Sequence, residues 1–300
     1  MSRLPALSLA AMPGRRQTTL ELAVEIEKRG FPGIYAPSMG DSLALCQALA
    51  HVTHTMHFGT SIMPIYFRQE VDFASTAAFI HEISGGRFRF GIGVSHAPAL
   101  QSRGISAGKP LSDMRAFVEK LRAAPRVGEL PPLVLATLRQ KMIRLAEEIG
   151  QGMVFANGAR SHMQTSLSVL SDQARKDDAF FIGNIIPTCV NDDRDAAMAV
   201  NRKTLTPYAM LPNYRNYWKE AGFVEEMEGV EAALERGDRD GIQHFLTDRW
   251  LSETTLFGSA RDVRDGVEAW FDAGIKTPII VPSSANGGQM VAFEEILAIF

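Results

Sequence analysis

Short apolar strands alternate with helices along almost the whole chain of 300 residues, and this alternation is the feature that most constrains the fold. Strands that alternate with helices form a parallel sheet with right-handed crossovers. The strand patterns lie at residues 7–11, 33–38, 56–67, 87–94, 132–137, 152–157, 180–190 and 277–283. Eight strand-and-helix units in a chain of this length predict an α/β fold, the closed (β/α)8 or TIM barrel.

Residues 192–257 interrupt this rhythm. They are rich in charge and helical in pattern, and they contain no convincing strand. We therefore expect a helical insertion after the seventh strand, lying over the C-terminal mouth of the barrel. No Gly/Ser-rich or Pro-rich linker divides the chain, so residues 1–300 are predicted to form a single domain.

Composition excludes several classes of partner. The net charge of −3 and the isoelectric point of about 6.2 give no basic footprint for nucleic acid. No apolar run reaches the ~18 residues that a membrane span requires. The two cysteines, Cys46 and Cys189, lie in unrelated segments, which indicates a reducing cytoplasm and no metal-binding spacing.

Three histidines recur at every third position, His51, His54 and His57, and raise the possibility of a metal site. They run from the end of an expected helix into the next strand, so they cannot share one face. No cysteine or carboxylate joins them as a further ligand. We expect no metal.

The stretch GGRFRFGIGVSHAP, residues 85–98, points to the chemistry. Active sites of this fold form at the C-terminal ends of the strands. Gly91 and Gly93 remove side chains where a flat ligand must approach the backbone, although they could equally relieve crowding inside the barrel. Ser95 then offers a hydroxyl and backbone N–H groups for a phosphate, and His96 a group that titrates near neutral pH.

Other strand ends supply further polar residues. Thr137 and Arg139 stand where the fifth strand passes into a helix, whose N-terminus attracts anions; the alternative is a solvated arginine. The second strand ends in Ser38 and Asp41. The remaining strand ends offer Ser61, Ile62, Tyr66, Asn157, Asn184 and Thr188. An aromatic set in the insertion fits a substrate pocket or helix packing equally well: Tyr208, Tyr214, Tyr217 and Trp218.

Four stretches together resemble the luciferase-like flavin and deazaflavin oxidoreductases, in the order of that family and over nearly the whole chain. SGGRFRFGIGVSH resembles the family's fourth strand, and FGTSIMPIYFR is similar to its third. VLATLRQKMIRLAEEIGQGMVF is similar to the fifth and sixth strands, and LFGSARDVRDGVEAWFDAGIKTPII to the last helix and strand.

The resemblance implies a barrel that binds coenzyme F420 or FMN, with the ring over the barrel mouth. It also implies a non-prolyl cis peptide at the end of strand three, at Thr60–Ser61 or Ser61–Ile62, of which we expect the second. By the same likeness, Gly93–His96 and Ala136–Arg139 hold the phosphate side. The residues so implied to bind the cofactor are Ser38, Ser61, Ile62, Gly93, Val94, Ser95, Ala136, Thr137, Leu138 and Arg139.

The likeness favours hydride transfer between coenzyme F420 and a small organic substrate. His96 would donate or accept the matching proton. The acid or histidine that ends the second strand in many relatives is missing, so either Asp41 or Ser38 takes that role or the role is lost. Alternatives are an FMN-dependent monooxygenase that activates oxygen, a cofactor-binding protein without turnover, and a flavin-free enzyme acting on a phosphorylated metabolite. Relatives are commonly homodimers.

Overall fold

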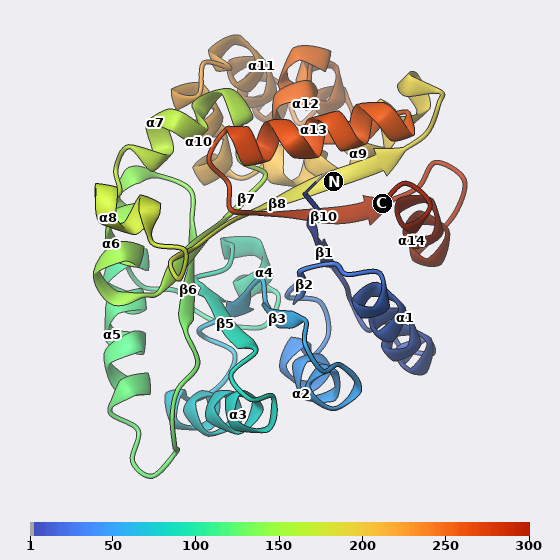
Figure 1. Ribbon diagram of the computed structural model, residues 1–300. Coiled ribbons are helices and arrows are strands. Elements are labelled where there is room, and N and C mark those ends of the chain that lie inside the picture. Colours follow the sequence, from blue (N-terminus) through green and yellow to red (C-terminus); the bar gives the residue numbers. More distant parts are fainter. Residues whose placement is uncertain (1–2) are drawn as a thin grey trace. The chain divides into compact units, whose positions relative to one another are not determined.

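The structure, a computed structural model, describes residues 3–300 (Figure 1). The chain falls into two compact units. The N-terminal unit comprises residues 4–155 and 169–183, and the C-terminal unit comprises 156–168 and 184–300 together with Arg3. Among residues 3–300 no helix is long and apolar enough to cross a membrane.

Parallel strands form the centre of the N-terminal unit. Their order is β1-β2-β3-β5-β6-β7, and the short strand β4 pairs with β5. Registers such as Ile34 opposite Phe58 and Gly91 opposite Val134 fix the pairing. The strands are β1 (Ala6–Ser8), β2 (Gly33–Ala36), β3 (His57–Thr60), β4 (Met63–Pro64), β5 (Phe88–Gly93), β6 (Leu133–Thr137) and β7 (Gly152–Ala156).

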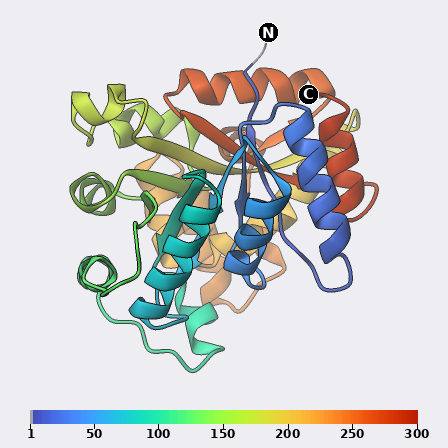
Figure 2. The ribbon, with the colours of Figure 1, turned by 60° about the horizontal axis from the view of Figure 1, so that its bottom comes forward.

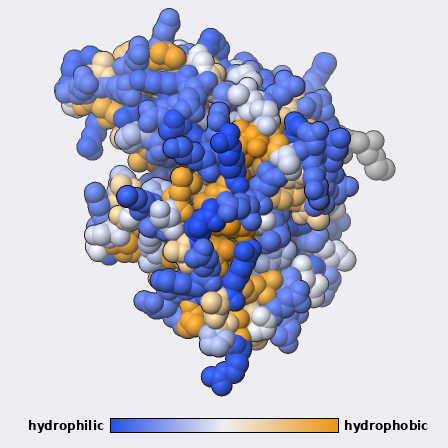
Figure 3. Space-filling model, turned by 90° about the vertical axis from the view of Figure 1, so that its left-hand side faces the viewer, coloured by the Kyte–Doolittle hydropathy of each residue, from blue (hydrophilic) through white to orange (hydrophobic). Residues whose placement is uncertain are grey.

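Helices follow these strands in turn and cover them. Figure 2 shows α1 to α3, blue to teal, standing side by side, and each also contacts the next. On the side where Figure 1 labels α5 and α6, the surface is largely hydrophilic with scattered apolar patches (Figure 3). The helices of this unit are α1 (Arg16–Lys28), α2 (Ser42–Val52), α3 (Glu70–Ile83), α4 (Ala97–Gln101), α5 (Pro110–Arg122), α6 (Gln140–Ile149) and α8 (Asp172–Lys176).

The Arg-Phe-Arg-Phe run of β5 divides its side chains between two faces of the sheet, as a strand must. Phe90 is fully buried and contacts Phe73 of α3, with ring centroids 5.7 Å apart. Arg89 lies on the other face, where its guanidinium donates to the Tyr35 hydroxyl at 3.2 Å and stands over the Phe181 ring. The arginine is therefore held inside the unit by a phenol and an aromatic face.

Arg87, just before β5, closes the C-terminal end of α2. Its guanidinium donates to the carbonyl oxygens of Ala50, Thr53 and Met56, at 2.9 to 3.1 Å. The carbonyls of Ala50 and Thr53 are of the kind that a helix end leaves without an intrahelical partner, and that of Met56 directly precedes β3. The first arginine of the run therefore fixes where α2 ends and β3 begins.

The C-terminal unit contains the remaining strands and the insertion. Strand β8 pairs with β9 and with β10. The elements are η1 (Arg160–His162), α7 (Met163–Leu167), β8 (Phe181–Val190, in this unit from Asn184), α9 (Arg194–Ala209), α10 (Pro212–Glu220), α11 (Val224–Glu235), η2 (Gly241–Phe245), α12 (Asp248–Thr254), β9 (Leu256–Gly258), α13 (Ala260–Asp272), β10 (Thr277–Ser283) and α14 (Gln289–Leu297).

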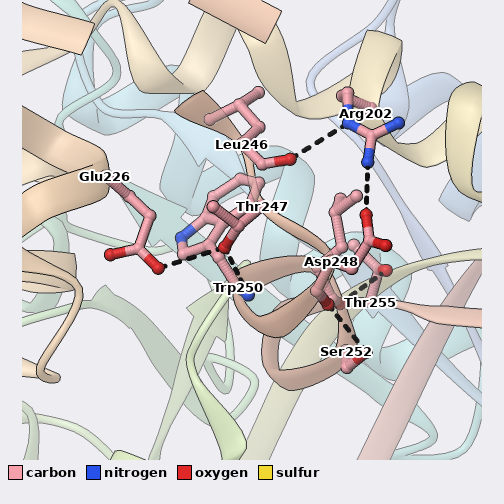
Figure 4. A network of polar contacts seen from close by, with 9 residues as sticks. Arg202, Glu226, Leu246, Thr247, Asp248, Trp250, Ser252 and Thr255 are labelled. Atoms are coloured by element: carbon pink, nitrogen blue, oxygen red, sulfur yellow. Dashed lines mark hydrogen bonds and ion pairs between the residues drawn. The ribbon is translucent and has the colours of Figure 1, made fainter. Parts of the chain in front are cut away.

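Side-chain hydrogen bonds tie the helices of the insertion together (Figure 4). Arg202 of α9 donates to the Leu246 carbonyl at 3.0 Å and to the Asp248 carboxylate at 2.8 Å. The Thr247 hydroxyl donates to Glu226 of α11 at 3.0 Å and accepts from the backbone N–H of Trp250, which caps α12. The predicted helical insertion is confirmed as a packed group of helices.

Two expectations about strands were wrong in detail. Residues 192–257 do contain the start of a strand, because β9 begins at Leu256 and pairs with Thr188–Val190 of β8. Its three residues are too few to show an alternating pattern. The strand expected over 56–67 is two strands, β3 and β4, because the chain bulges at Ser61 and Ile62 between them.

Candidate functional site

The end of β3 carries the peptide bond that the sequence singled out. The Ser61–Ile62 bond is cis, as expected, and Thr60–Ser61 is not. The Ser61 N–H donates to the Ala36 carbonyl at the end of β2, at 2.7 Å. Strand β4 then resumes the pairing, with Met63 opposite Ile92. The bulge is therefore anchored to both neighbouring strands.

The two glycines of β5 make room for this bulge. A Cβ on Gly91 would lie 1.9 Å from the Thr60 carbonyl oxygen. A Cβ on Gly93 would lie 2.8 Å from Cδ1 of Ile62 and 2.9 Å from Cβ of Ala136. Relief of crowding thus accounts for both glycines. It also places Ile62, Gly93 and Ala136, from the ends of three strands, against one another.

Two buried hydroxyl groups are sequence neighbours of this cluster: Ser61 precedes Ile62, and Thr137 follows Ala136. Ser61 and Thr137 are each 6% exposed, and neither side-chain oxygen has a hydrogen-bond partner within residues 3–300. By contrast, the Thr60 hydroxyl donates to the Gly91 carbonyl at 2.6 Å. A buried hydroxyl without a partner in the protein is costly, so water or a bound ligand is expected to supply the partner.

The chain turns sharply after β5. Ser95 adopts the left-handed conformation with φ of 62°, which is uncommon for serine and leads from the strand into α4. Val94, Ser95 and His96 are all half-buried. Burial lowers the pKa of the His96 imidazole below its ordinary value of 6.5, so this ring is neutral at pH 7.

The end of β6 leads directly into a helix. Ala136 and Leu138 are half-buried, and Arg139 is exposed at the N-cap of α6, where its carbonyl accepts from Met142 and Ile143. The ten-residue helix α6 therefore presents its positive N-terminal end at the same end of the sheet as Thr137. This is an arrangement that binds anions.

The two residues predicted at the end of β2 are exposed, and the carboxylate of Asp41 already has partners. Ser38 is exposed. The Asp41 carboxylate caps α2 by accepting from the Ala44 N–H at 3.2 Å, and it pairs with Arg68 at 2.6 Å. This ion pair joins the end of β2 to the segment after β4. Sequence reasoning missed Arg68, because no pattern links two residues that lie 27 positions apart.

A second contact that the sequence did not indicate joins the segments after β4 and β5. The Tyr66 hydroxyl donates to Oδ2 of Asp113 at 2.6 Å, and the Gly108 N–H donates to the same oxygen at 2.9 Å. The Arg103 guanidinium lies over the Phe67 ring, 4.3 Å from its centroid. Residues 66–68 are thus tied both to the end of β2 and to the segment that follows β5.

In the C-terminal unit, polar residues follow β7 and lie within β8. The Asn184 side-chain oxygen accepts from the Gly158 N–H at 3.2 Å, and Asn157 adopts φ of 56°. Thr188 is fully buried, and its hydroxyl donates to the Ile186 carbonyl. The contacts of the Asn184 oxygen and of the Thr188 hydroxyl are structural, whereas the buried side-chain nitrogens of Asn157 and Asn184 have no hydrogen-bond partner within residues 3–300.

The aromatic set of the insertion divides. Tyr214, Tyr217 and Trp218 are buried, and Trp218 packs edge-on against Trp250 at 4.7 Å. Tyr208 alone is half-buried, and its ring meets that of Tyr214 at 5.1 Å. Helix packing therefore explains three of the four aromatic residues.

The turn that contains His54 is held by a carboxylate. The Glu27 carboxylate of α1 accepts from the backbone N–H groups of His54, Thr55 and Met56 at 2.7 to 2.9 Å. This contact fixes the turn between α2 and β3. Across residues 3–300, no three or more histidine, cysteine, aspartate or glutamate side chains are grouped so as to hold a metal ion.

Comparison with known proteins gives this arrangement a context. A family model described as luciferase-like monooxygenase matches residues 5–277. A 5,10-methylenetetrahydromethanopterin reductase of Archaeoglobus fulgidus is 24% identical in an alignment of 281 residues. The alignment covers 83% of this chain and 84% of that protein.

Two solved structures align with nearly the whole chain. One is an F420-dependent secondary alcohol dehydrogenase in complex with an F420–acetone adduct, at TM-score 0.76 and 16% identity, covering 100% of this chain and 98% of that one. Another is the oxygenating constituent of 3,6-diketocamphane monooxygenase from Pseudomonas putida with FMN, at TM-score 0.58 and 16% identity, covering 94% and 92%. The likeness confirms the predicted fold class, a (β/α)8 barrel with a helical insertion after the seventh strand.

Proposed function

Because the chain belongs to the luciferase-like monooxygenase family, a family of oxidoreductases, we propose that it transfers hydride between coenzyme F420 and a small organic substrate. The relative from Archaeoglobus fulgidus is a reductase, and one of the aligned structures holds F420. Family membership favours an enzyme over a cofactor carrier without turnover. The isolated cysteines favour a cytoplasmic location, and the family likeness favours a homodimer.

The observation that carries this proposal is the pair of buried hydroxyls without partners, on Ser61 and Thr137. Ser61 precedes Ile62, and Thr137 follows Ala136. A Cβ on Gly93 would meet both Ile62 and Ala136, so the two hydroxyls belong to one small region of the N-terminal unit. A planar coenzyme with carbonyl and phosphate oxygens supplies acceptors for such hydroxyls. The residues present therefore fit the coenzyme that the family implies.

We assign the binding roles by region. The cis bulge at Ile62 would support the ring from behind, and main-chain groups of residues 93–96 would hold the phosphate side. The positive end of α6, with residues 136–139, would balance the charge of the phosphate. When bound, the deazaflavin supplies a carbon atom that carries the hydride. The protein then has to orient ring and substrate face to face.

His96 would handle the proton that accompanies the hydride. Because burial holds its pKa below the ordinary value, the imidazole is neutral at pH 7 and is ready to accept a proton from a substrate hydroxyl. In the reverse direction the protonated ring returns that proton. Asp41 is the less suitable group, since Arg68 and the N-terminus of α2 both hold its carboxylate in place.

FMN is the second candidate cofactor, because one of the aligned structures is in complex with FMN. An FMN enzyme of this family would activate oxygen. The two possibilities separate when the purified protein is titrated with each coenzyme and followed by fluorescence. F420 binding with hydride exchange supports the first candidate, whereas tight FMN binding with oxygen uptake supports the second.

The variant Thr137→Val tests the site directly. It replaces an unpartnered hydroxyl by a methyl group of the same shape, so the melting temperature of the free protein should stay the same or rise. Affinity for F420 should fall by roughly tenfold, as the loss of one hydrogen bond typically produces.

Thr60→Val is the matched control, because its hydroxyl has a partner in the Gly91 carbonyl. This control should lower the melting temperature. If Thr137→Val destabilised the free protein as much as Thr60→Val and left coenzyme affinity unchanged, the proposed site would be wrong.

A further inference from the structure

The segment between β5 and α5, residues 94–109, carries the proposed proton-handling residue His96 and leads to Asp113 in the first turn of α5. Residues 102–109 are almost entirely exposed, so little buried area holds them in place. The near end of the segment is anchored by Leu100, which is 2% exposed and whose carbonyl accepts from the N–H groups of Arg103 and Ile105. The far end depends on polar contacts.

These contacts converge on one carboxylate oxygen. Oδ2 of Asp113 accepts from the Tyr66 hydroxyl at 2.6 Å and from the Gly108 N–H at 2.9 Å. Burial and the neighbouring carboxylate raise the pKa of the Tyr66 phenol well above its ordinary value, so the hydroxyl remains the donor throughout the working pH range. Asp113 also lies in the first turn of α5, where the helix dipole favours a negative charge.

The lack of a side chain at residue 108 leaves room for this contact. A Cβ on Gly108 would lie 2.7 Å from both carboxylate oxygens of Asp113. An alanine at residue 108 would therefore force the Asp113 carboxylate to move. Gly108 and Asp113 are local neighbours, five residues apart, whereas Tyr66 lies 47 residues before Asp113. The tyrosine therefore reaches the carboxylate through tertiary packing and not within one helix or strand.

We propose that Tyr66, Gly108 and Asp113 form a latch that positions the segment carrying Ser95 and His96, resting on the function proposed above. The latch joins that segment to residues 66–68, which follow the cis bulge of Ile62. The Arg103–Phe67 stack and the Arg68–Asp41 ion pair extend the same connection. All three latch residues are positioning residues, because they act through the groups that would touch the coenzyme.

The experiment compares hydrogen exchange and coenzyme binding in the full chain. Tyr66→Phe removes one donor and Gly108→Ala forces the carboxylate away, so each should speed amide exchange in residues 95–109 by roughly tenfold without coenzyme. Asp113→Asn keeps one acceptor oxygen and should have a smaller effect. The double variant Tyr66→Phe/Asp113→Asn should be non-additive, because both changes act on one contact.

Coenzyme affinity provides the readout that a merely structural contact would leave unchanged. F420 binding should weaken by roughly tenfold in Tyr66→Phe. Thr247→Val, which breaks a comparable hydroxyl–carboxylate contact with Glu226 in the C-terminal unit, should alter neither measurement.

Unchanged exchange in residues 95–109 would overturn the latch. Faster exchange with unchanged affinity would overturn its positioning role. Failure of the wild-type protein to bind either coenzyme would instead overturn the proposed function. The wild-type titration reveals that failure without any variant, so the two failures can be told apart.

Discussion

At the scale of single residues, the account depends most on His96. It lies three residues after β5, is the half-buried N-cap residue of α4, and has a pKa lowered by burial. A neutral imidazole next to a coenzyme site is suited to accept a proton, and no other residue assigned to the site combines these properties. Ser95 and Thr137 offer hydroxyls, which do not titrate in the working range.

Replacing His96 by alanine should lower turnover by about 10² to 10⁴ and change coenzyme affinity little. In the wild type, turnover in the direction of substrate oxidation should fall at acidic pH with a midpoint below 6.5, since the form that acts in that direction is the neutral ring. Steady-state kinetics across pH 5 to 9 measure both effects. His54→Ala, an exposed side chain of the same unit, is the control. Unchanged turnover in the His96 variant would remove it from this role.

Which residues end the strands was predictable from the sequence, because strand patterns and chain order decide that. The cis bond at Ser61–Ile62 was expected from family likeness and is confirmed. The partners of Tyr66 and Asp41 were not predictable, since each contact joins residues tens of positions apart through tertiary packing. The lack of partners at Ser61 and Thr137 was equally invisible, because it depends on every atom nearby.

At the scale of elements, the Gly-x-Gly of β5 exists because β3 bulges toward it. The sequence left two explanations open, room for a ligand and relief of crowding. The structure favours relief of crowding for both glycines. A Cβ on Gly91 would collide with main chain, whereas a Cβ on Gly93 would meet only side chains. The two glycines should therefore differ in tolerance.

Gly91→Ala should destabilise the protein by more than about 4 kcal/mol, because its Cβ meets the Thr60 carbonyl and backbone cannot yield easily. Gly93→Ala should cost only about 1–3 kcal/mol, since Ile62 can adjust. The double variant Gly93→Ala/Ala136→Gly should recover part of that loss by vacating the neighbouring Cβ. Urea denaturation measures all three. Equal losses for Gly91→Ala and Gly93→Ala would contradict this explanation.

At the scale of the whole molecule, the alternation of strands and helices was sufficient to predict the fold class. All eight expected strands are present, although the third is divided at the bulge. The strand β9 escaped detection because it has three residues and no alternation of its own. Hydrophobic periodicity reveals only elements that are long enough to show several repeats of the pattern. A strand of three residues is defined instead by its pairing with a neighbouring strand.

Stability should fall as the pH drops below about 6.5, the ordinary histidine value. His57, His96 and His162 each have a pKa lowered chiefly by burial, so the unfolded chain takes up protons that the folded chain resists. The stability they contribute is present above that value and is lost as the pH falls through the folded pKa values. Thermal unfolding between pH 7.5 and 5.5 should show the decline, with a shallower slope in His96→Asn. A flat profile would contradict it.

The central claim is that a planar redox coenzyme binds at the ends of β3, β5 and β6. A crystal structure of the protein with F420 tests it most directly. The account predicts the ring against the Ile62 bulge, the phosphate side at residues 93–96 and 136–139, and hydrogen bonds from the hydroxyls of Ser61 and Thr137 to the coenzyme. A coenzyme bound elsewhere, or one that leaves both hydroxyls without a partner, would contradict it.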